Sequence, residues 1–393
     1  MADGGDRPAE KIRIVASIND ADAKQWNDLI NADGAPANPF VSHEFLRALE
    51  NSKSASAESG WAPSHLLLEE DDSIAAAAPC YLKSHSFGEY VFDHHWADAY
   101  ERAGGRYYPK LLCAVPFTPV PGPRISGGSR KRRSALADAL AQIAGQRRLS
   151  SVHINFISEI AAAELQEQGW LIRRGVQYHW FNRGYRRYDD FLAGLSSRKR
   201  KALKRERREA NDGVAIRRLT GRDIDARAWE AFWSFYQDTG ARKWGRPYLA
   251  RSFFCEIAET MADRLMMVVA EHDGRLIAGA LNFIGGDALY GRYWGRIEDR
   301  PFLHFEVCYH QAIEFAIERG LARIEAGAQG EHKIARGYEP VATHSAHWIA
   351  NSSFRVAIAQ HLARERSAID AEIAELRSLT PYRTDWPRTS RPD

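Results

Sequence analysis

The sequence predicts an α/β protein, with mixed sheets covered by helices, built from two similar domains. Three observations predict this. The chain has 393 residues, more than a single hydrophobic core usually holds. Apolar runs bounded by turn residues, typical of strands, are interspersed with segments of helical spacing. The same order of elements also occurs twice along the chain. We therefore expect an N-terminal domain over residues 1–180 and a C-terminal domain over residues 181–393.

The composition is that of an ordinary globular protein, with 45% hydrophobic residues, 27% charged residues and a formal net charge of +3. No apolar run approaches the ~20 residues that a membrane helix needs, and the first residues lack the features of a signal peptide. The four cysteines are far apart and show no CxxC spacing: Cys80, Cys113, Cys255 and Cys308. We expect buried thiols in a cytoplasmic protein, with neither disulfides nor a zinc site.

The repeat is clearest in two three-stranded meanders, at residues 65–96 and 265–294. Each contains an apolar run, an acidic turn, a run rich in small apolar residues, a polar or glycine turn, and an aromatic run that ends in tryptophan. Acidic turns between apolar runs are typical of β-hairpins. The two meanders indicate a duplicated domain; the alternative is a chance match between two unrelated meanders.

The elements around each meander follow the order β-α-α-β-β-β-α-β. In the second copy we expect a strand at 214–220, helices around 229–236 and 253–261, the meander, a helix at 305–318, and strands at 323–328 and 343–349. In the first copy we expect a strand at 11–17, helices around 26–30 and 42–50, the meander, a helix at 135–144 and a strand at 151–157. A long C-terminal helix is predicted by five apolar residues near one face: Ile358, Leu362, Ile369, Ile373 and Leu376.

Several segments resemble the FemAB-like family, which is related to the FemABX peptidyltransferases of cell-wall synthesis. They include NPFVSHEFLRAL (38–49), YVFDHHWADAYERAG (90–104), DTGARKWGRPYL (238–249), LYGRYWG (289–295) and GAQGEHKIARGYEP (327–340). The resemblance covers nearly the whole chain after residue 35. It implies tandem GNAT-like acyltransferase domains, here followed by the C-terminal helix, and an acyl or aminoacyl transferase.

In a GNAT-type fold the two central parallel strands diverge and the acyl donor lies between them. The resemblance therefore implies a site at the ends of the strands 289–295 and 323–328. Acyl transfer to an amine needs a base for the ammonium proton and donors for the developing oxyanion. Glu325 and His332 are the candidate bases, and Tyr293 is the candidate proton donor to the leaving group.

Other interpretations of these residues remain open. Glu325 can instead form a structural ion pair with Arg323 or Arg292. The sequence contains no GxSxG motif and no cysteine in a recognisable nucleophile context, so we expect direct attack without a covalent intermediate.

Polar and aromatic residues near these strand ends are candidates for substrate binding. Lys333 and Arg336 are expected to hold a phosphate or a carboxylate. The other candidates in the second copy are Arg292, Trp294, Gln329 and Glu331.

The first copy has a second group of candidate substrate-binding residues: Asp93, Trp96, Asp98, Tyr100, Glu101 and Lys110. We expect them to form a polar wall facing the cleft between the domains, where aromatic and charged side chains suit a sugar or a peptide. The alternative is an ordinary strand edge. On a strand, His94 and His95 would point to opposite faces, so no metal site is expected.

In GNAT enzymes the pyrophosphate of coenzyme A is held by a Q/R-x-x-G-x-G/A loop before a helix, where free N–H groups bind phosphate. The first copy has a near match at Arg124, Gly127 and Gly128, followed by a basic helix. The second copy has no glycine at the corresponding segment, 296–304. The alternative is an ordinary loop that enters a helix with a solvated basic first turn.

A strongly basic segment, RKRKALKRERR (198–208), is expected to form part of a helix at 196–210. Its eight basic residues repel one another, which favours contact with an anion; a solvated helix face is the alternative. The candidate polyanion contacts are Lys199, Arg200, Lys201, Lys204 and Arg205. The resemblance suggests aminoacyl-tRNA as their partner, because it is the donor of the peptidyltransferases, but no sequence-specific RNA-binding motif is present.

The leading hypothesis is N-acyl or aminoacyl transfer to an amine acceptor, with a cell-wall peptide precursor as one candidate acceptor. The donor is aminoacyl-tRNA or acyl-CoA, and no tightly bound cofactor is expected. The alternatives are an acyl-CoA-dependent N-acetyltransferase and a non-catalytic protein that binds a ligand or RNA. The sequence does not identify the acceptor, the acyl group or the oligomeric state.

Overall fold

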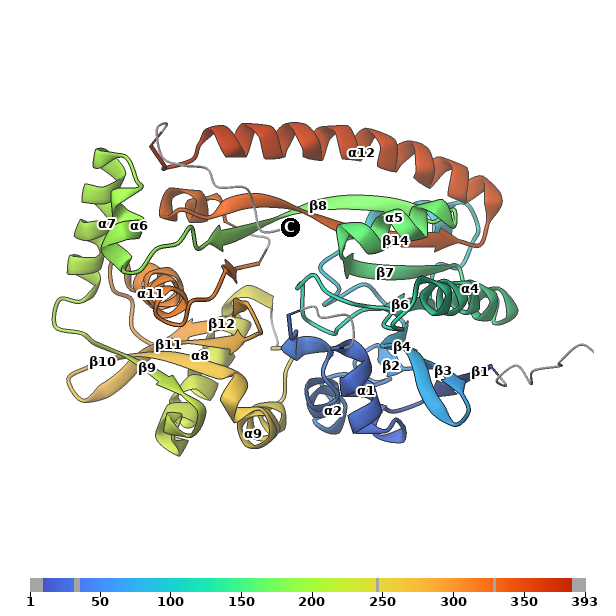
Figure 1. Ribbon diagram of the computed structural model, residues 1–393, viewed down its shortest axis with the longest axis horizontal. Coiled ribbons are helices and arrows are strands. Elements are labelled where there is room, and N and C mark those ends of the chain that lie inside the picture. The colour runs from blue at the N-terminus through green and yellow to red at the C-terminus, as the bar shows by residue number, and fades with distance from the viewer. Residues whose placement is uncertain (1–9, 32–35, 245–246, 328–329, 384–393) are drawn as a thin grey trace, which may run out of the picture. The chain divides into compact units, whose positions relative to one another are not determined.

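The computed structural model describes residues 10–31, 36–244, 247–327 and 330–383 (Figure 1). The chain forms two compact units. Unit 1 comprises residues 1–175 and 343–368, and unit 2 comprises residues 176–342 and 369–393. Residues 343–368 were expected in the C-terminal domain but belong to unit 1. Within that unit, residues 344–349 pair with the strand at 151–157.

Unit 1 contains two sheets. The smaller is antiparallel, in the order β1-β3-β4, from β1 (Lys11–Val15), β3 (His65–Glu70) and β4 (Ser73–Ala78). The acidic turn between β3 and β4 forms the expected hairpin, with positive φ at Asp71 and Asp72. The strands of the second sheet lie in the order β2-β5-β6-β7-β14: β2 (Trp61–Pro63), β5 (Cys80–Lys83), β6 (Lys110–Cys113), β7 (Ser151–Ile157) and β14 (Glu339–Ile349, from Thr343 onward in unit 1). Only β6 and β7 pair in parallel among the described strands of this sheet.

The helices of unit 1 are α1 (Ala23–Ile30), α2 (His43–Asn51), α3 (His94–Arg102), α4 (Arg130–Gln146) and α5 (Glu159–Glu167). Short 3₁₀ turns precede α1 and α2, at Ile18–Asp20 and Pro39–Val41. Side-chain oxygens of Asp22, Ser42, Ser129 and Ser158 cap the N-termini of α1, α2, α4 and α5. These caps satisfy backbone N–H groups that have no partner within the helix.

The expected third strand of the first meander is wrong. Residues 94–102 form helix α3, and Asp93 occupies its N-cap position. In a helix, positions i, i+3, i+4 and i+7 share one face. Asp93, Trp96 and Ala97 are accordingly buried, whereas Asp98 is exposed. The strand-based argument about His94 and His95 therefore does not apply.

The central sheet of unit 1 has one apolar and one polar face. Leu111 and Cys113 on β6 pair with Val152 and Ile154 on β7, and all four pack in the core that includes Leu136 and Leu140 of α4. Side chains alternate between the faces of a sheet. The opposite face therefore carries a polar row in which Lys83 is directly opposite Lys110, and His153 on β7 pairs with Leu112 on β6.

Unit 2 contains strands in the order β8-β13-β12-β11-β10-β9. These are β8 (Leu171–Phe181, from Val176 onward in unit 2), β9 (Ala215–Thr220), β10 (Leu265–His272), β11 (Arg275–Ile284), β12 (Ala288–Arg296) and β13 (Arg323–Glu325). The meander β10-β11-β12 was predicted from the sequence and is confirmed. Strands β12 and β13 are parallel, and the other described pairs in this unit are antiparallel.

The helices of unit 2 are α6 (Tyr188–Ala193), α7 (Ser197–Ala210), α8 (Ala226–Trp244), α9 (Arg251–Thr260), α10 (Leu303–Phe305) and α11 (Gln311–Glu318). A π-helical turn, η5 (Glu306–His310), joins α10 to α11. The 3₁₀ turns are η3 (Gly221–Asp223), η4 (Ala262–Arg264) and η6 (Glu331–Arg336). The long helix α12 (Ser352–Ser378), also predicted, begins in unit 1 and ends in unit 2.

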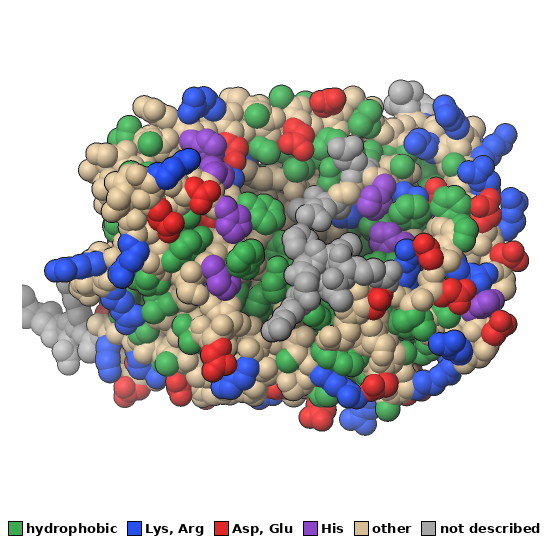
Figure 2. Space-filling model, turned by 180° about the vertical axis from the view of Figure 1, so that it is seen from behind, with side chains coloured by type: hydrophobic (Ala, Val, Ile, Leu, Met, Phe, Trp, Pro, Cys, Tyr) green, Lys and Arg blue, Asp and Glu red, His purple; other side chains and the backbone are tan. Residues whose placement is uncertain are grey.

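Charges of both signs cover the surface. Figure 2 shows acidic and basic side chains interspersed over the face that it presents, in keeping with the net charge of +3. Among the described residues, no helix combines the length and the apolarity needed to cross a bilayer.

Candidate functional site

The two central parallel strands of unit 2 diverge after a short common stretch. β12 and β13 pair at three positions, the last of which joins Tyr290 to Glu325. β13 ends there, and the following residues bond to β8, where Ala326 N–H donates to the Tyr178 carbonyl at 3.3 Å. β12 instead continues along β11 to Arg296.

A β-bulge accompanies the divergence. On β11, Leu281 pairs with Tyr293 and Asn282 pairs with Gly291, so Arg292 is an extra residue in β12. A bulge bends its strand and redirects its side chains, and bulges are common beside active sites. Arg292 itself lies over the ring of Tyr293, with its guanidinium carbon 5.5 Å from the ring centroid.

Glu325, one of the two candidate bases, is buried at the end of β13. Arg323 Nε donates to its Oε1 at 3.0 Å, and the same guanidinium pairs with Asp287. His179 Nε2 lies 3.8 Å from Oε2. Burial and the negative charge of Glu325 together raise the pKa of Tyr290. Of the two interpretations of Glu325, the ion pair with Arg323 is therefore present in the structure.

His332, the other candidate base, is exposed and belongs to a group of rings that we call the His332 cluster: Trp294, His304, Phe305, Tyr309 and His332. His332 Nε2 lies 3.1 Å from the Tyr309 hydroxyl. Ring centroids are 4.7 Å apart between Trp294 and His304, and 6.0 Å apart between His304 and His332. The structure thus brings together two of the predicted residues, Trp294 and His332.

Tyr293 lies on the other face of β12. Its ring contacts Tyr236 of α8 and Phe254 of α9, with centroids 5.6 and 6.0 Å apart. Neighbouring strand residues point to opposite faces, so Tyr293 and Trp294 do not belong to one group.

The two predicted anion-binding residues are buried and hold the loop after β13. Lys333 Nζ donates to the carbonyls of Ala326 and Gly327 at 2.7 and 3.3 Å, and burial lowers its pKa to about 8. Arg336 donates from Nη1 to the His332 carbonyl at 2.8 Å. Gln329 lies outside the described residues, and Glu331 begins the turn η6.

The basic segment forms helix α7, as predicted. One side is held by ion pairs: Glu206 with Arg336 at 2.8 Å, and Arg207 with Glu306 and Glu314 at 2.9 Å each. Among the predicted polyanion contacts, Lys204 lies 3.4 Å from Asp189 and Arg205 lies 3.5 Å from Glu209.

Three of the five predicted polyanion contacts of α7 have no ion partner among the described residues. Lys199, Arg200 and Lys201 form no ion pair with any residue in the described part of the chain. All three lie in the first turns of the helix. They are available to an anion, as are Arg198 and Arg208, which also form no ion pair with a described residue.

The predicted coenzyme A loop of unit 1 is held by internal contacts. Arg124 is buried, and its guanidinium donates to the carbonyls of Val120 and Pro123 at 2.5 and 3.3 Å. Gly127 approaches Ala76 so closely that a Cβ would lie 2.9 Å from the alanine Cβ, and Gly128 has a φ of +59°.

The basic first turn of α4 after this loop is paired with carboxylates: Arg130 with Glu167, Lys131 with Glu10, Arg132 with Glu70, and Arg133 with Glu164. These contacts fit the ordinary-loop interpretation, and binding of coenzyme A here stays a prediction.

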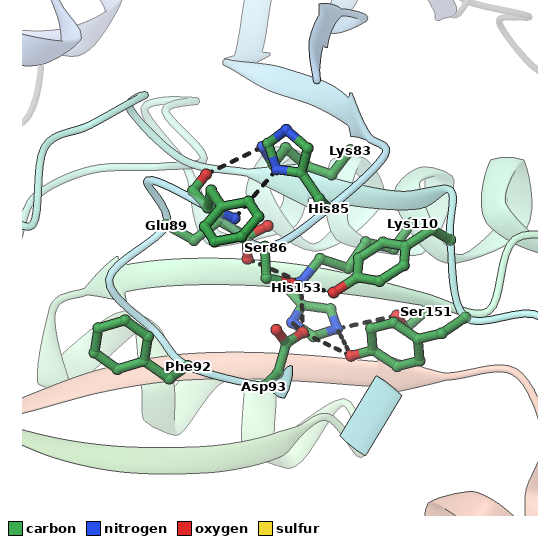
Figure 3. A network of polar contacts seen from close by, with 12 residues as sticks. Lys83, His85, Ser86, Glu89, Phe92, Asp93, Lys110, Ser151 and His153 are labelled. Atoms are coloured by element: carbon green, nitrogen blue, oxygen red, sulfur yellow. Dashed lines mark hydrogen bonds and ion pairs between the residues drawn. The ribbon is translucent and has the colours of Figure 1, made fainter. Parts of the chain in front are cut away.

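The polar face of unit 1 carries a buried charged group, the Lys110 cluster: Lys83, Glu89, Asp93, Lys110 and His153 (Figure 3). Lys110 Nζ donates to Glu89 Oε2 at 2.8 Å and also pairs with Asp93. His153 Nδ1 lies 3.6 Å from Asp93 Oδ2. Lys83 Nζ lies 3.7 Å from the Trp61 ring centroid. Glu89 and Asp93 lie in the connection between β5 and α3. Their negative charges offset the positive charges of the two lysines, which lie directly opposite each other on β5 and β6.

Burial shifts the pKa values in the cluster. It raises the pKa of Glu89 to about 7, against the attraction of Lys110, and it lowers the pKa of Lys83 to about 7. Burial also opposes the ionisation of Asp93, but Lys110 and His153 hold the pKa of that carboxyl well below its usual range. Near pH 7, therefore, Glu89 and Lys83 change charge while Asp93 stays ionised.

Of the residues predicted for the first copy, Asp93, Trp96 and Lys110 lie at this cluster. The Trp96 ring centroid is 5.0 Å from that of His347, whose Nδ1 lies 3.1 Å from His153 Nδ1. Asp98 is exposed, and Tyr100 instead packs on Phe354 at 4.7 Å.

Sequence reasoning did not identify four of these polar residues: Lys83, Glu89, His153 and His347. A usable signal was the lysine that ends the apolar strand CYLK (80–83) and the lysine that begins the apolar strand KLLC (110–113). A buried lysine requires a carboxylate partner.

Three solved structures share this fold at low sequence identity. FemX has a TM-score of 0.55 and 13% identity, covering 86% of this chain and 98% of that chain. The C-terminal DUF2156 domain of an Agrobacterium fabrum protein named as a lysylphosphatidylglycerol synthetase has a TM-score of 0.53 and 11% identity, with 87% and 96% covered. A conserved Bacteroides thetaiotaomicron protein of unknown function has a TM-score of 0.50 and 9% identity, with 87% and 100% covered. The predicted mixed α/β fold is confirmed.

No curated protein sequence matches the chain significantly. The model of the FemAB-like family, whose description is peptidoglycan biosynthesis and recognition, matches residues 17–384. This match includes the diverging strands, helix α7 and the Lys110 cluster. The chain therefore belongs to the FemAB-like family.

Proposed function

We propose that this protein is an acyltransferase of peptidoglycan-related biosynthesis, which forms an amide on an amine acceptor by direct attack on an activated acyl group. The observation that carries the proposal is the divergence of β12 and β13. The two strands pair at only three positions, and β12 then continues past the bulge at Arg292 without a ladder partner in β13. Membership of the FemAB-like family supports the same class of reaction.

The diverging strand offers a binding edge for an acyl donor. Backbone N–H groups alternate in direction along a strand. Those of β12 beyond Tyr290 that point away from β11 are not paired with β13, which ends at Glu325. Such N–H groups suit the carbonyl oxygen of an acyl group and stabilise the negative charge that develops there during attack.

The contacts of His332 support it as the base. Its ring is exposed, and the Tyr309 hydroxyl 3.1 Å from Nε2 orients it. In the proposed step the amine nitrogen attacks the acyl carbon and a C–N bond forms. His332 takes the ammonium proton, and the bond to the leaving oxygen or sulfur breaks as that atom takes up a proton. Glu325 is less suited because Arg323 already donates to it, and we assign no step to Tyr293.

For the donor we propose aminoacyl-tRNA, contacted through its phosphates by Lys199, Arg200 and Lys201. This choice depends on the difference between the two basic helices. The first-turn cations of α4 are paired with carboxylates, whereas these three cations of α7 have no ion partner among the described residues.

The test is a filter-binding titration with aminoacylated and uncharged tRNA over a series of salt concentrations. The variant is K199A/R200A/K201A, and the charge-matched control is R102A/R147A/R148A, which removes three exposed arginines of unit 1. We expect tighter binding of the charged tRNA. We also expect the salt slope to fall by about 2 to 3 in the variant, since each phosphate contact contributes about 0.7 to 0.9, and to stay unchanged in the control.

Other outcomes favour other functions. Absence of tRNA binding at low salt, together with thermal stabilisation by acetyl-CoA, would identify an acyl-CoA-dependent N-acetyltransferase. Equal affinity for charged and uncharged tRNA, without amide formation from any donor, would indicate an RNA-binding protein. Amide formation is followed by mass spectrometry with a panel of amines, because the acceptor is not identified.

A further inference from the structure

The Lys110 cluster contains more hydrogen-bonding capacity than its own contacts use. Four buried polar atoms around it have no hydrogen-bond partner among the described residues: Glu89 Oε1, Asp93 Oδ1, Trp96 Nε1 and His347 Nε2. Each side chain is at most 3% exposed. Leaving a buried polar atom without a partner destabilises the folded state, and most buried polar atoms in native proteins have a partner.

These four atoms belong to one connected network. Glu89 and Asp93 both bind Lys110 through their other carboxylate oxygen. Asp93 continues to His153 at 3.6 Å and His153 to His347 at 3.1 Å. Trp96 then packs edge-on against His347. These four atoms therefore lie in one connected network on the polar face of the unit 1 sheet, whereas other buried atoms without a hydrogen-bond partner among the described residues lie elsewhere in the chain.

The chemistry of the unused atoms indicates a complementary ligand. Two are carboxylate oxygens, which accept hydrogen bonds and carry negative charge. A primary ammonium group has three N–H donors and a positive charge, so it satisfies both oxygens with charge-assisted bonds. The indole N–H of Trp96 is a donor, suited to a carbonyl or hydroxyl oxygen on the same ligand.

The charge of the cluster favours a cation at neutral to alkaline pH. Lys110 offsets one of the two carboxylates. Above pH 7 Glu89 is ionised and Lys83 is neutral, which leaves one net negative charge. The titratable groups that surround Glu89 are Lys83 on β5, Lys110 on β6, Asp93 before α3, and Tyr107 and Tyr108 before β6.

The segment that carries Glu89 and Asp93 lies between β5 and α3. Residues 84–93 connect β5 to α3 without helix or strand. They carry two largely exposed aromatic rings, Phe87 and Phe92, at 60% and 54% exposure. Glu89 and Asp93 belong to the same segment, so a movement that admits a ligand also moves both carboxylates.

We propose that the Lys110 cluster is a binding site for a ligand with a primary ammonium group, held by the free oxygens of Glu89 and Asp93. An amine acceptor of acyl transfer is such a ligand, and to that extent the inference rests on the proposed function. Binding is nevertheless measured without any transfer step, so the two proposals succeed or fail separately.

The test is thermal unfolding of the full chain with increasing n-propylamine at pH 8 and constant ionic strength. A ligand that binds the folded state raises the Tm in proportion to the logarithm of its concentration above Kd. We expect this rise with n-propylamine. We expect none with n-propanol, which lacks the charge, or with tetramethylammonium, which lacks N–H donors.

Variants identify the site. E89Q keeps the shape of the side chain but removes its charge, and we expect it to weaken binding at least tenfold. The control D98N removes an exposed carboxylate of α3 and should leave binding unchanged. Wild-type affinity should rise between pH 6 and pH 8, and the rise should be smaller in E89Q, in which Lys83 still titrates and Glu89 no longer does.

The proposal is overturned if tetramethylammonium stabilises the protein as well as n-propylamine does. It is also overturned if E89Q and D98N bind n-propylamine with equal affinity. Absence of any rise with n-propylamine would also overturn it, and would show that internal water satisfies these atoms. The comparison of n-propylamine with tetramethylammonium uses the wild-type protein, so it tests the proposed ammonium site even if E89Q does not fold.

Discussion

Arg336 joins helix α7 to the turn that carries His332, because its guanidinium donates to Glu206 Oε2 at 2.8 Å and to the His332 carbonyl at 2.8 Å. The guanidinium also lies 3.3 Å from the ring centroid of Phe305 in the His332 cluster. Burial opposes the ionisation of Glu206, but His310 and Arg336 hold the pKa of its carboxyl below its ordinary value. Two hydrogen bonds of Arg336 therefore connect the helix of the proposed donor contact to the turn that carries the proposed base.

Replacing Glu206 with Gln should destabilise the protein by about 1–3 kcal/mol, because it leaves the buried Arg336 without its carboxylate. The measurement is the free energy of unfolding in urea. The matched control is E209Q on the same helix, whose exposed pair with Arg205 should contribute less than about 1 kcal/mol. Equal effects of the two variants would contradict the role assigned to Arg336.

Two glycines of β12 should respond very differently to alanine. A Cβ at Gly295 would lie 2.1 Å from the Phe235 carbonyl oxygen of α8, whereas at Gly291 the nearest atom is Asn282 Oδ1 at 3.5 Å. G295A should therefore cost at least about 1–3 kcal/mol through overpacking, and G291A less than about 1 kcal/mol. Thermal unfolding of both variants checks this. A tolerated G295A would mean that α8 does not pack on β12 as described.

The difference in stability between E89Q and the wild-type protein should depend on pH. The pKa of Glu89 is raised from an ordinary value of 4.5 to about 7 in the folded protein, so the folded state binds the proton more tightly than the unfolded state does. Stability from this group is present below pH 4.5 and is lost as the pH rises to 7. E89Q should therefore gain relative to the wild-type protein between pH 4.5 and 7, and the difference should be constant above pH 8.

Urea unfolding at several pH values tests this prediction. The control D98N, which changes an exposed carboxyl, should give a difference that varies little with pH. A flat difference for E89Q would mean that Glu89 is not buried beside Lys110.

Catalysis should distinguish the two candidate bases. H332A should lower kcat by about 100-fold, the lower range for loss of general base catalysis, with little loss of stability because the ring is exposed. E325Q should retain at least about a tenth of wild-type kcat and should instead lower stability, because Arg323 loses a partner. Steady-state kinetics beside circular dichroism separate these effects. A larger loss of kcat in E325Q than in H332A would instead identify Glu325 as the base.

Local sequence patterns predicted the elements whose side chains interact mainly with near neighbours. The β10-β11-β12 meander, helix α7 and helix α12 form where the turns, the charge run and the helical spacing indicate. Residues 90–96 show the limit of such patterns. Their aromatic run is compatible with a strand, yet residues 94–102 are helical and place Asp93 and Trp96 on the buried side.

The sequence by itself determined the α/β class, the β10-β11-β12 meander and helices α7 and α12, since alternation, helical spacing and turn chemistry act over a few residues. Tertiary structure alone decided which groups meet. Glu325 pairs with Arg323, Tyr293 and Trp294 separate onto two faces, and Glu89 and Asp93 converge on Lys110. The physical reason is that strand register and burial set these contacts. Both depend on residues far apart in the chain, such as His153 beside His347, which no local pattern connects.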